Sequence, residues 1–482
     1  MKKTIIEQVS YTLLIFLVLF CTNLNAQAWE PICTFDQNNN NIRAYELFPD
    51  TVTDQLYIGG LFNIINGDTM GNITAFDGNQ FHFMTDSMNA CWNGGCNGVV
   101  SIIRYQNEIV ASLMRSSTYE VRPQIVGLGL WNGIKWQPLD GGIASFYNST
   151  IQYYYPSTLY DFCVSDNTLY VAGSFQIVDS VSATGMASWD GAKWNTYTMP
   201  PIPPGSGLLS TSIAKYKGNI YLGGNFIATV DGQQTNDLIR FDGTSWHKVG
   251  EDLVDGWMNL HDMEVFQDKL YVAGYFSKAD GNPGNSIMSW DGEKWDDLGG
   301  GACSPFGVID DLFVYKDKLY VAGGFDCISG IEVNNVATWD GEKWCRIGNS
   351  VFNRAIHGVA VWRDTVYVAG SFFEVDGVPF RFLARYIGDH STDTCSTPVS
   401  AAPEPSKTGF KLSPNPTSDL LEIQAPSPIE SVWIYDAMGR AVLQPGVFGL
   451  RTSVSVGDLP AGLYFVSVRA GGRSWSGKFV RQ

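Results

Sequence analysis

The residues best suited to chemistry in this chain are histidines and aspartates that share one spacing to a repeated tyrosine. Counting ten residues back from each tyrosine, or from its counterpart Ile109, reaches in chain order Leu47, Val99, Tyr160, Thr211, His261, Asp310 and His357. The residue after each of these adds carboxylates at Asp161, Asp262 and Asp311. Imidazole and carboxylate groups brought together in this way can hold polar ligands or metal ions.

We therefore predict a ligand-binding cluster at the mouth of a central channel, made by Tyr160, Asp161, His261, Asp262, Asp310, Asp311 and His357. The alternative is structural, because polar side chains at such places also hydrogen-bond the backbone of a neighbouring strand. An error of one residue in register would scatter the cluster, since successive side chains of a strand face opposite ways. No metal ligand set and no cofactor is predicted, and a bound divalent cation is left open.

Known catalytic motifs do not appear in the sequence. It contains no Gly-x-Ser-x-Gly elbow, no His-Glu-x-x-His pair and no phosphate-binding loop. A copper oxidase of the galactose-oxidase kind needs two histidine and two tyrosine ligands, and the 5 histidines here are few and poorly placed for that. Paired carboxylates for glycoside hydrolysis stay open, because their separation is not visible in a sequence. A binding protein is favoured over an enzyme.

The strands that would position these residues come from a repeat. Its core is an aliphatic residue, tyrosine, an aliphatic residue, a small residue, glycine, any residue and phenylalanine, as in residues 319–325. Six copies centre on Tyr57, Tyr170, Tyr221, Tyr271, Tyr320 and Tyr367, and a degenerate seventh lies at 109–112. Repeats of this length, built of strands and turns, predict a radial β-architecture.

Each unit continues with two aromatic residues on either side of an Asp-Gly or Asn-Gly pair. These residues are Phe76/Phe81, Trp131/Trp136, Trp189/Trp194, Phe241/Trp246, Trp290/Trp295 and Trp339/Trp344. The dipeptides supply the positive φ angles of a tight hairpin, and we expect the aromatic rings to be buried between neighbouring sheets. Four short antiparallel strands per unit correspond to one blade of a β-propeller.

The seventh unit ends near Tyr386 without the final aromatic strand. Residues 28–31 resemble residues 135–138, which supply that strand in the second unit. The amino-terminal strand is therefore predicted to complete the last blade, because an open ring would leave unpaired edges. The predicted fold is all-β: a monomeric seven-bladed β-propeller of four-stranded blades over residues 27–388, followed by a small carboxy-terminal β-sandwich.

The net charge of the chain and its first 26 residues indicate which partners it can bind and where in or outside the cell it acts. A net charge of −17 over 482 residues disfavours nucleic acid, whose phosphates need basic surface. Residues 1–26 are predicted to be a secretory signal peptide, because two lysines precede an apolar run too short to span a bilayer. No transmembrane helix is expected. Cysteines in an exported chain suit disulfides, and we predict the pairs Cys91–Cys96 and Cys303–Cys327.

The composition changes after Gly388. Residues 389–407 are predicted to be a linker, and 408–482 a β-sandwich of short strands between Gly and Pro turns. Its motifs are Ser-Pro-Asn-Pro at 413–416, Tyr-Asp-x-x-Gly-Arg at 435–440 and Leu-Pro-x-Gly-x-Tyr at 459–464, with Pro414, Asn415, Pro416, Gly439 and Gly462 as their marker residues. This stretch resembles the type A carboxy-terminal sorting domain of the bacterial type IX secretion system. The resemblance implies that the secretion machinery is a partner and that the chain reaches the outer cell surface or the medium.

The repeats over residues 28–388 resemble those of kelch-type and polarity-marker-type propellers. That resemblance implies a fold and says almost nothing about activity. Tyrosines in residues 147–160 could stack on sugar rings. We predict a non-catalytic binding module for a protein or a glycan. The alternatives are an extracellular polysaccharide-active enzyme with carboxylates at the channel mouth, and a purely structural surface protein.

Overall fold

The computed structural model describes residues 28–34, 43–62, 64–84, 96–112, 114–115, 128–139, 143–144, 146–148, 153–155, 158–179, 181–203, 208–250, 259–277, 284–304, 307–379, 381–388, 395–396, 411–425, 427–436, 441–446, 449–470 and 473–482. Every regular element in these ranges is a β-strand, so the all-β prediction is confirmed. No helix able to span a membrane occurs in the ranges given. The chain divides into two compact units, Met1–Ala401 and Ala402–Gln482. The predicted signal peptide lies outside the described residues.

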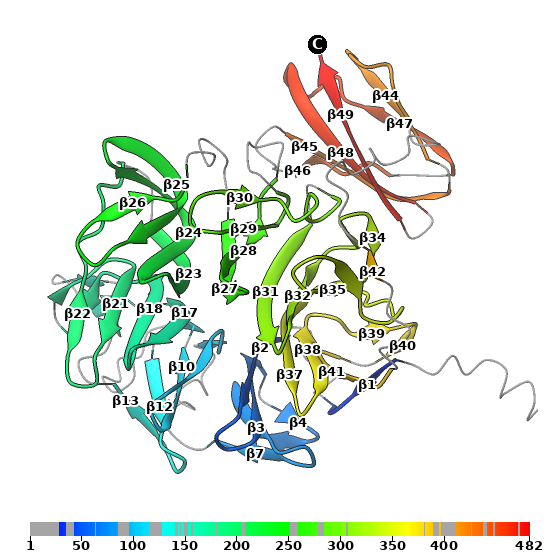
Figure 1. Cartoon of the computed structure of the whole chain (residues 1–482). Helices are drawn as coiled ribbons and strands as arrows, with labels where there is room; N and C mark the ends of the chain where they lie inside the picture. Colours follow the sequence, from blue (N-terminus) through cyan, green and yellow to red (C-terminus); the bar gives the residue numbers. More distant parts are fainter. Residues whose placement is uncertain are drawn as a thin grey trace, which may run out of the picture. The chain divides into compact units, whose positions relative to one another are not determined.

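The first unit contains a series of antiparallel sheets, numbered here in chain order (Figure 1). Sheet one consists of β2 (Arg43–Asp50), β3 (Gln55–Leu61), β6 (Ile73–Phe76) and β7 (Phe81–Phe83). Sheet two consists of β9 (Ile102–Tyr105), β10 (Glu108–Ser112), β12 (Leu128–Trp131) and β13 (Trp136–Pro138). Sheet three consists of β17 (Thr158–Ser165), β18 (Thr168–Ser174), β21 (Met186–Trp189) and β22 (Trp194–Thr196).

Four further sheets have the same order of strands. Sheet four contains β23 (Leu208–Tyr216), β24 (Asn219–Val230), β25 (Gln233–Phe241) and β26 (Trp246–Lys248), and sheet five contains β27 (Asn259–Phe266), β28 (Lys269–Tyr275), β29 (Ile287–Trp290) and β30 (Trp295–Asp296). Sheet six contains β31 (Val308–Tyr315), β32 (Lys318–Gly324), β35 (Val336–Trp339), β36 (Trp344–Arg346) and β42 (Cys395–Ser396). Sheet seven contains β37 (Ile356–Trp362), β38 (Thr365–Gly370), β41 (Leu383–Tyr386) and β1 (Trp29–Pro31).

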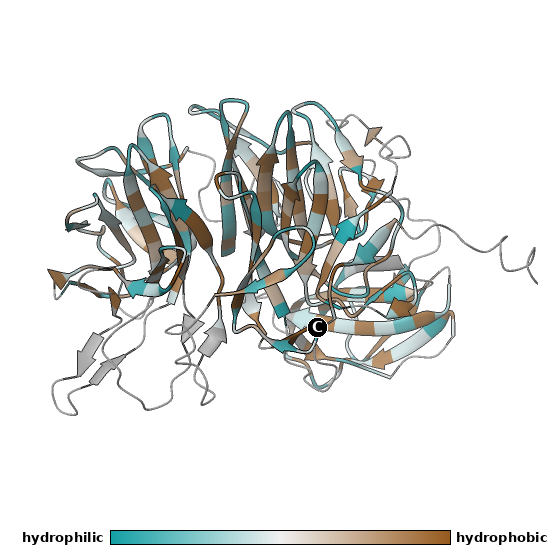
Figure 2. Ribbon diagram, turned by 90° about the horizontal axis from the view of Figure 1, so that it is seen from below, coloured by the Kyte–Doolittle hydropathy of each residue, from teal (hydrophilic) through white to brown (hydrophobic). Residues whose placement is uncertain are grey.

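Small sheets of short strands lie in the connections of the first unit. They are β4 (Ile64–Ile65) with β5 (Asp68–Thr69), β8 (Cys96–Gly98) with β11 (Met114–Arg115), β14 (Ile143–Ala144) with β19 (Ile177–Val178) and β20 (Val181–Ser182), β15 (Phe146–Asn148) with β16 (Tyr153–Tyr155), β33 (Cys327–Ile328) with β34 (Ile331–Glu332), and β39 (Glu374–Val375) with β40 (Val378–Pro379). Figure 2 shows hydrophobic residues along the strands of the sheets and hydrophilic residues in many of the loops that join them.

The first strand of each sheet contacts the first strand of the next. These contacts run from β2 to β9, β17, β23, β27, β31 and β37, and β37 contacts β2 again. Figure 1 shows several of these strands, β2, β17, β27, β31 and β37 among them, around the middle of the unit. We call them the inner strands.

Sheet seven joins the two ends of the first unit. Trp29 pairs with Tyr386 and Pro31 with Ala384 in an antiparallel register, which confirms the predicted pairing of the amino-terminal strand. The Trp29 side chain is fully buried, with its ring 5.1 Å from that of Tyr386 and 5.4 Å from that of Phe352. Burial of a tryptophan at this junction removes a large apolar surface from water.

The aromatic pairs lie across the outer hairpins of sheets one to six, as expected. In sheet six Trp339 and Trp344 are opposite one another, with ring centroids 5.0 Å apart. Asp340 Oδ1 accepts hydrogen bonds from the backbone N–H groups of Glu342 and Lys343, and Gly341 has φ +102°. The second tryptophan also ties its sheet to the preceding one, since Trp344 Nε1 donates to Leu298 O at 3.0 Å.

The segment after sheet seven returns to sheet six. Within the linker expected at 389–407, Cys395–Ser396 forms β42, which pairs with β36. A disulfide joins Cys345 to Cys395, a pair that the sequence did not indicate. The predicted disulfide between Cys303 and Cys327 is present. The predicted Cys91–Cys96 pair lies outside the described residues, and Cys33 and Cys163 are free thiols.

The second unit consists of two antiparallel sheets. One contains β43 (Lys411–Ser413), β44 (Leu420–Gln424) and β47 (Arg451–Ser455), and the other contains β46 (Ala441–Leu443), β45 (Ile429–Asp436), β48 (Gly462–Ala470) and β49 (Arg473–Arg481). Leu421 and Val454 from the first sheet share one hydrophobic core with Ile434, Val466 and Phe479. Apolar residues alternate along these strands, so each sheet has one face toward that core.

Candidate functional site

The inner strands share a β-bulge at one position. In six of them the register with the second strand skips a single residue, and the residues skipped are Tyr45, Tyr160, Thr211, His261, Asp310 and His357. A bulge leaves one residue unpaired and redirects its side chain. We call these six residues the bulge arc. Each is partly exposed, whereas the residue directly before it is buried.

The glycine of the repeat explains why the bulge recurs. A Cβ atom built on Gly274 would lie 2.1 Å from the carbonyl oxygen of Asn259, and on Gly323 it would lie 2.1 Å from that of Val308. Both carbonyls belong to the inner strand, two residues before its bulged residue. Only glycine permits this close approach of two backbones. The repeated glycine is therefore the sequence signal for the bulge.

Three members of the bulge arc are linked by hydrogen bonds. Asp310 on β31 lies between two imidazoles: His261 Nδ1 on β27 is 2.8 Å from its Oδ1, and His357 Nδ1 on β37 is 2.8 Å from its Oδ2. Burial raises the pKa of the Asp310 carboxyl, but the two imidazole hydrogen bonds outweigh it and lower this pKa to about 2. Asp310 is therefore an anion at neutral pH, bridging three consecutive sheets.

The arc continues beyond this triad. The ring of Tyr45, from sheet one, lies 5.9 Å from that of His357. On the other side, the Thr211 hydroxyl donates to the carbonyl of Leu260, next to His261. Tyr160 occupies the same position in sheet three, and burial raises the pKa of its phenol. The structure therefore brings His261, Asp310 and His357 together, with Tyr45 beside them.

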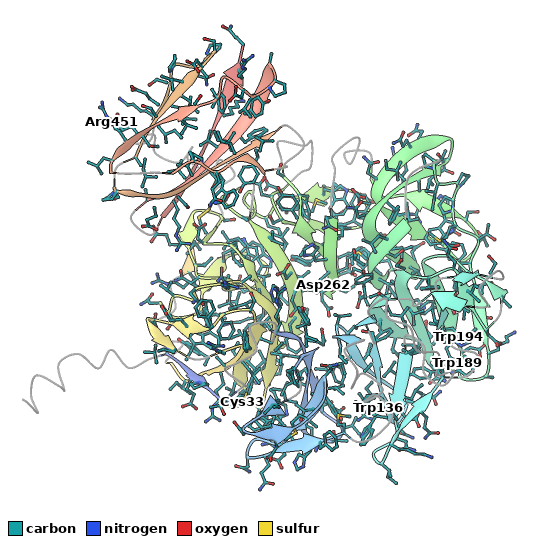
Figure 3. The ribbon with its side chains drawn as sticks, turned by 180° about the vertical axis from the view of Figure 1, so that it is seen from behind. Cys33, Trp136, Trp189, Trp194, Asp262 and Arg451 are labelled. Carbon is teal, nitrogen blue, oxygen red and sulfur yellow. A yellow bond between two sulfur atoms is a disulfide. The ribbon has the colours of Figure 1, made fainter. Side chains whose placement is uncertain are left out.

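The predicted aspartates Asp161, Asp262 and Asp311 follow the bulge and serve the fold. Asp161 Oδ2 accepts the backbone N–H of Ile213 at 2.8 Å, and Asp262 Oδ2 accepts that of Leu312 at 2.7 Å. Asp311 accepts the N–H of Val359 at 2.6 Å in the same way. Each carboxylate thus ties its inner strand to the next, which is the structural alternative considered above. Figure 3 shows Asp262 toward the middle of the first unit, whereas Trp189 and Trp194 lie at its outer side.

These carboxylates also interact with one another. Burial raises the pKa of Asp161 to about 8, and the charge of Asp262 adds to that rise. Burial likewise raises the pKa of Asp262 to about 6 and that of Glu264 to about 8. Glu46 in sheet one has its pKa raised by burial and then by Asp262 and Asp161, although these residues belong to sheets one, five and three. The carboxylates of non-adjacent sheets therefore face a common centre.

Two of the seven residues reached by counting ten back from the repeat, Leu47 and Val99, do not lie at the bulge position. The turn between β2 and β3 is two residues longer than the corresponding turn in sheet three, so Tyr45 takes the place expected for Leu47. In sheet two, Val110 rather than Ile109 corresponds to the tyrosine, because Ile109 pairs with Trp131. The count from Ile109 to Val99 is therefore one residue off, and Val99 is a buried core residue. Tyr45, Glu46 and Glu264 were missed for the site.

The other described histidines, His82 on β7 and His247 on β26, each contact an aspartate of the adjacent hairpin turn, and we call them the turn histidines. His82 Nε2 lies 2.6 Å from Asp77 Oδ2, and His247 Nε2 lies 2.7 Å from Asp242 Oδ2. Both aspartates belong to the outer hairpin turns. His390 and the tyrosine side chains at 147–155 lie outside the described part of the chain. Within the ranges that the structure describes, no three His, Cys, Asp or Glu side chains are placed to hold a metal ion.

The tail has its own arrangement of motif residues. Asn415 Nδ2 donates to Lys478 O at 2.9 Å, while Asn415 Oδ1 accepts the N–H of Val480 at 2.9 Å. Asn415, between Pro414 and Pro416, thus fastens the start of the second unit to β49. Gly462 begins β48 and pairs with Arg481. Gly439 lies outside the described residues.

Comparison with known proteins supports the resemblance of the second unit to a sorting domain. Residues 411–482 match the family described as secretion system C-terminal sorting domain. The tail is a sorting domain. It marks proteins that the type IX secretion system exports to the cell surface or the medium, so this chain is a secreted cargo of that system and interacts with its machinery.

The other comparisons add little. One solved structure is described as PorZ, an essential bacterial surface component of the type IX secretion system of Porphyromonas gingivalis. It is 13% identical to this chain, and the matched region covers 92% of this chain and 82% of the PorZ chain. Its TM-score is 0.17, and we draw neither fold nor function from it. No curated protein matches the chain significantly.

Proposed function

We propose that the sorting domain delivers a closed, seven-bladed, kelch-like β-propeller that binds a protein or glycan partner at the bulge arc and performs no chemistry. Under this proposal the chain is organised as a signal peptide (1–26), a monomeric propeller (27–388), a linker (389–407) and the sorting domain (408–482). The observation that carries the binding role is the Asp310 carboxylate held between His261 and His357 at the centre of the sheets.

Contacts between consecutive sheets support the closed ring. Polar contacts between strand ends and turns join each sheet to the next, and sheet seven back to sheet one. They are Arg104–Asp50, Tyr105–Asn167, Lys215–Asp166, Tyr216–Asp268, Gln267–Asp340, Tyr315–Asp364 and Arg363–Asp54. The pairing of β1 with β41 also covers an edge of sheet seven that would otherwise be open to edge-to-edge aggregation.

Two properties of the arc support binding there. Its six residues are of four types, Tyr, Thr, His and Asp, whereas the residues that pack the sheets repeat, and function in a repeated architecture resides where the units differ. The triad residues also keep accessible surface, since side-chain exposure is 27% for His261, 18% for Asp310 and 25% for His357.

The polysaccharide-active enzyme is the less favoured function. A general acid and its partner carboxylate must both be free to reach the substrate. Asp161, Asp262 and Asp311 instead accept backbone N–H groups of the next sheet, which holds their oxygens toward the protein. The purely structural role does not explain why two histidines converge on one aspartate.

The test compares two double variants of the exported chain on arrays of glycans and bacterial surface proteins. His261→Gln with His357→Gln removes the imidazoles of the arc, and His82→Gln with His247→Gln removes two turn histidines as a matched control. We expect a binder that the first variant loses and the control keeps. Absence of any binder, equal binding by both variants, or hydrolysis of a polysaccharide by the wild-type chain would contradict the proposal.

A further inference from the structure

The Asp310 contacts determine which imidazole nitrogens carry hydrogen. Both His261 and His357 approach the carboxylate through Nδ1, and an ionised carboxylate can only accept. Each ring must therefore carry its hydrogen on Nδ1. In a neutral imidazole the second nitrogen then has a free lone pair. Neither Nε2 atom has a hydrogen-bond partner among the residues that the structure describes.

The surroundings restrict the charge of a ligand. Asp310 is an anion that lies within hydrogen-bond distance of both imidazoles. The six arc positions contain no lysine or arginine. A phosphate, sulfate or carboxylate would therefore meet negative charge without a compensating cation. Ligands without negative charge are favoured.

The aromatic members of the bulge arc restrict the shape of a ligand. Tyr45 lies beside His357, and Tyr160 takes the equivalent place in sheet three. Phenol rings next to hydrogen-bond acceptors suit a ligand with an apolar face and a rim of hydroxyl donors, which is the character of a sugar ring. A peptide offers its donors along an extended backbone rather than around a ring.

We propose that Asp310 is a positioning residue that holds His261 and His357 as Nδ1–H tautomers, so that the bulge arc binds the end of an uncharged saccharide through hydroxyl groups donated to both Nε2 atoms. The proposal rests on the proposed function and names its ligand class. Binding forms no covalent bond and moves no electrons.

The first test needs no ligand. The chain has 5 histidines, so long-range proton–nitrogen NMR of the exported chain labelled with 15N-histidine gives few signals. At alkaline pH we expect Nδ1–H tautomers for His261 and His357. The turn histidines His82 and His247 bond their aspartates through Nε2 and are expected to be Nε2–H tautomers in the same spectrum. Nε2–H tautomers for the arc histidines would overturn the proposal.

The second test measures affinity. Neutral oligosaccharides are titrated by calorimetry beside sulfated and uronic acid oligosaccharides of equal length. Asp310→Asn keeps the shape but puts an amide N–H opposite one imidazole, which must then move its hydrogen to Nε2. We expect one tautomer signal to change and neutral saccharide affinity to fall about tenfold, the effect of one lost hydrogen bond. His82→Gln is the control and keeps full affinity.

The outcomes separate this proposal from the one before it. Preference for the anionic sugars, or an unchanged affinity in a folded Asp310→Asn chain, would overturn the saccharide site. Binding only to a protein partner would also overturn it, while leaving the proposed binding role intact. If Asp310→Asn does not fold, His261→Gln replaces it, and the wild-type tautomers still decide the positioning role.

Discussion

Aspartates on the inner strands have two roles: Asp262 accepts hydrogen bonds from the backbone, and Asp310 holds imidazoles. The oxygens of Asp262 accept backbone N–H groups of Met263 and Leu312, whereas Asp310, on the neighbouring strand, accepts imidazoles. The difference follows from the bulge. The bulged residue keeps a side chain directed away from the ladder, and the next residue is directed at the neighbouring sheet. A pattern of residue types alone does not separate these two positions.

The protonation of the buried Glu264 carboxyl can be tested through the pH dependence of stability. The folded-state pKa of this carboxyl is about 8 against an ordinary 4.5, mainly because of burial. Between these values the folded chain keeps a proton that the unfolded chain has released, so stability falls as pH rises. Glu264→Gln imitates the protonated form. We expect nearly equal stability near pH 4.5 and a gain of roughly 4 kcal/mol for the variant at pH 8, measured by chemical denaturation.

The exposed turn variant Glu293→Gln is the control for that experiment. It should follow the wild-type pH dependence throughout. If Glu264→Gln showed the same slope as the wild type between pH 5 and 8, the burial of this carboxylate would not be as described.

The histidines and aspartates of the arc could be predicted because five inner strands keep one spacing to their tyrosines. Prediction failed at Tyr45 and Glu46, since the length of a turn changes the count without changing the strand pattern. It failed at Glu264 because this carboxylate lies three residues after the bulged His261 and joins the cluster only through packing. The backbone N–H partners of the aspartates belong to other sheets and have no local signal.

Among the elements, the inner strand and its glycine form the unit that creates the site. Gly274→Ala would place a methyl group 2.1 Å from Asn259 O and 2.9 Å from Leu260 Cα. Because both atoms are backbone, the strand must shift, and we expect a loss of roughly 3 kcal/mol in unfolding free energy together with a changed His261 NMR signal. Gly446→Ala, where the added Cβ meets no atom, should leave both unchanged. A stable Gly274→Ala chain with an unaltered His261 signal would refute this origin of the bulge.

The two disulfides close loops of different reach. Cys303–Cys327 spans 24 residues within sheet six and its loops, and Cys345–Cys395 spans 50 residues that include β37, β38 and β41. By the chain-entropy relation, removing them costs about 3.5 and about 4 kcal/mol respectively. We expect Cys345→Ala with Cys395→Ala to increase hydrogen exchange in sheet seven, and Cys303→Ala with Cys327→Ala to increase it in sheet six. An equal increase of hydrogen exchange in sheets six and seven of both variants would contradict this expectation.

The second bond shows the limit of sequence reading at this scale. Cys303 and Cys327 flank one repeat, so the fold prediction placed them together. Cys345 and Cys395 become neighbours only because the chain, after completing sheet seven, passes back to the edge of sheet six. Nothing in the Ser-, Thr- and Pro-rich segment indicates that β42 pairs there.

At the scale of the whole molecule, export and folding belong to different units. The sorting domain has its own hydrophobic core, and the seven sheets have theirs. We expect deletion of residues 408–482 to leave the sheets folded but to stop the chain in the periplasm, as fractionation with an antibody to the first unit would show. Full export of the shortened chain would contradict the sorting role, and an unfolded remnant would contradict the independence of the two units.

Sheet seven has a consequence for the order in which the chain is made. Arg385 and Glu30, whose side chains form an ion pair across β41 and β1, are 355 residues apart. A ribosome working from the first codon therefore presents β1 long before any partner for it exists. Sheet seven cannot be completed until β41, near the end of the first unit, has been synthesised.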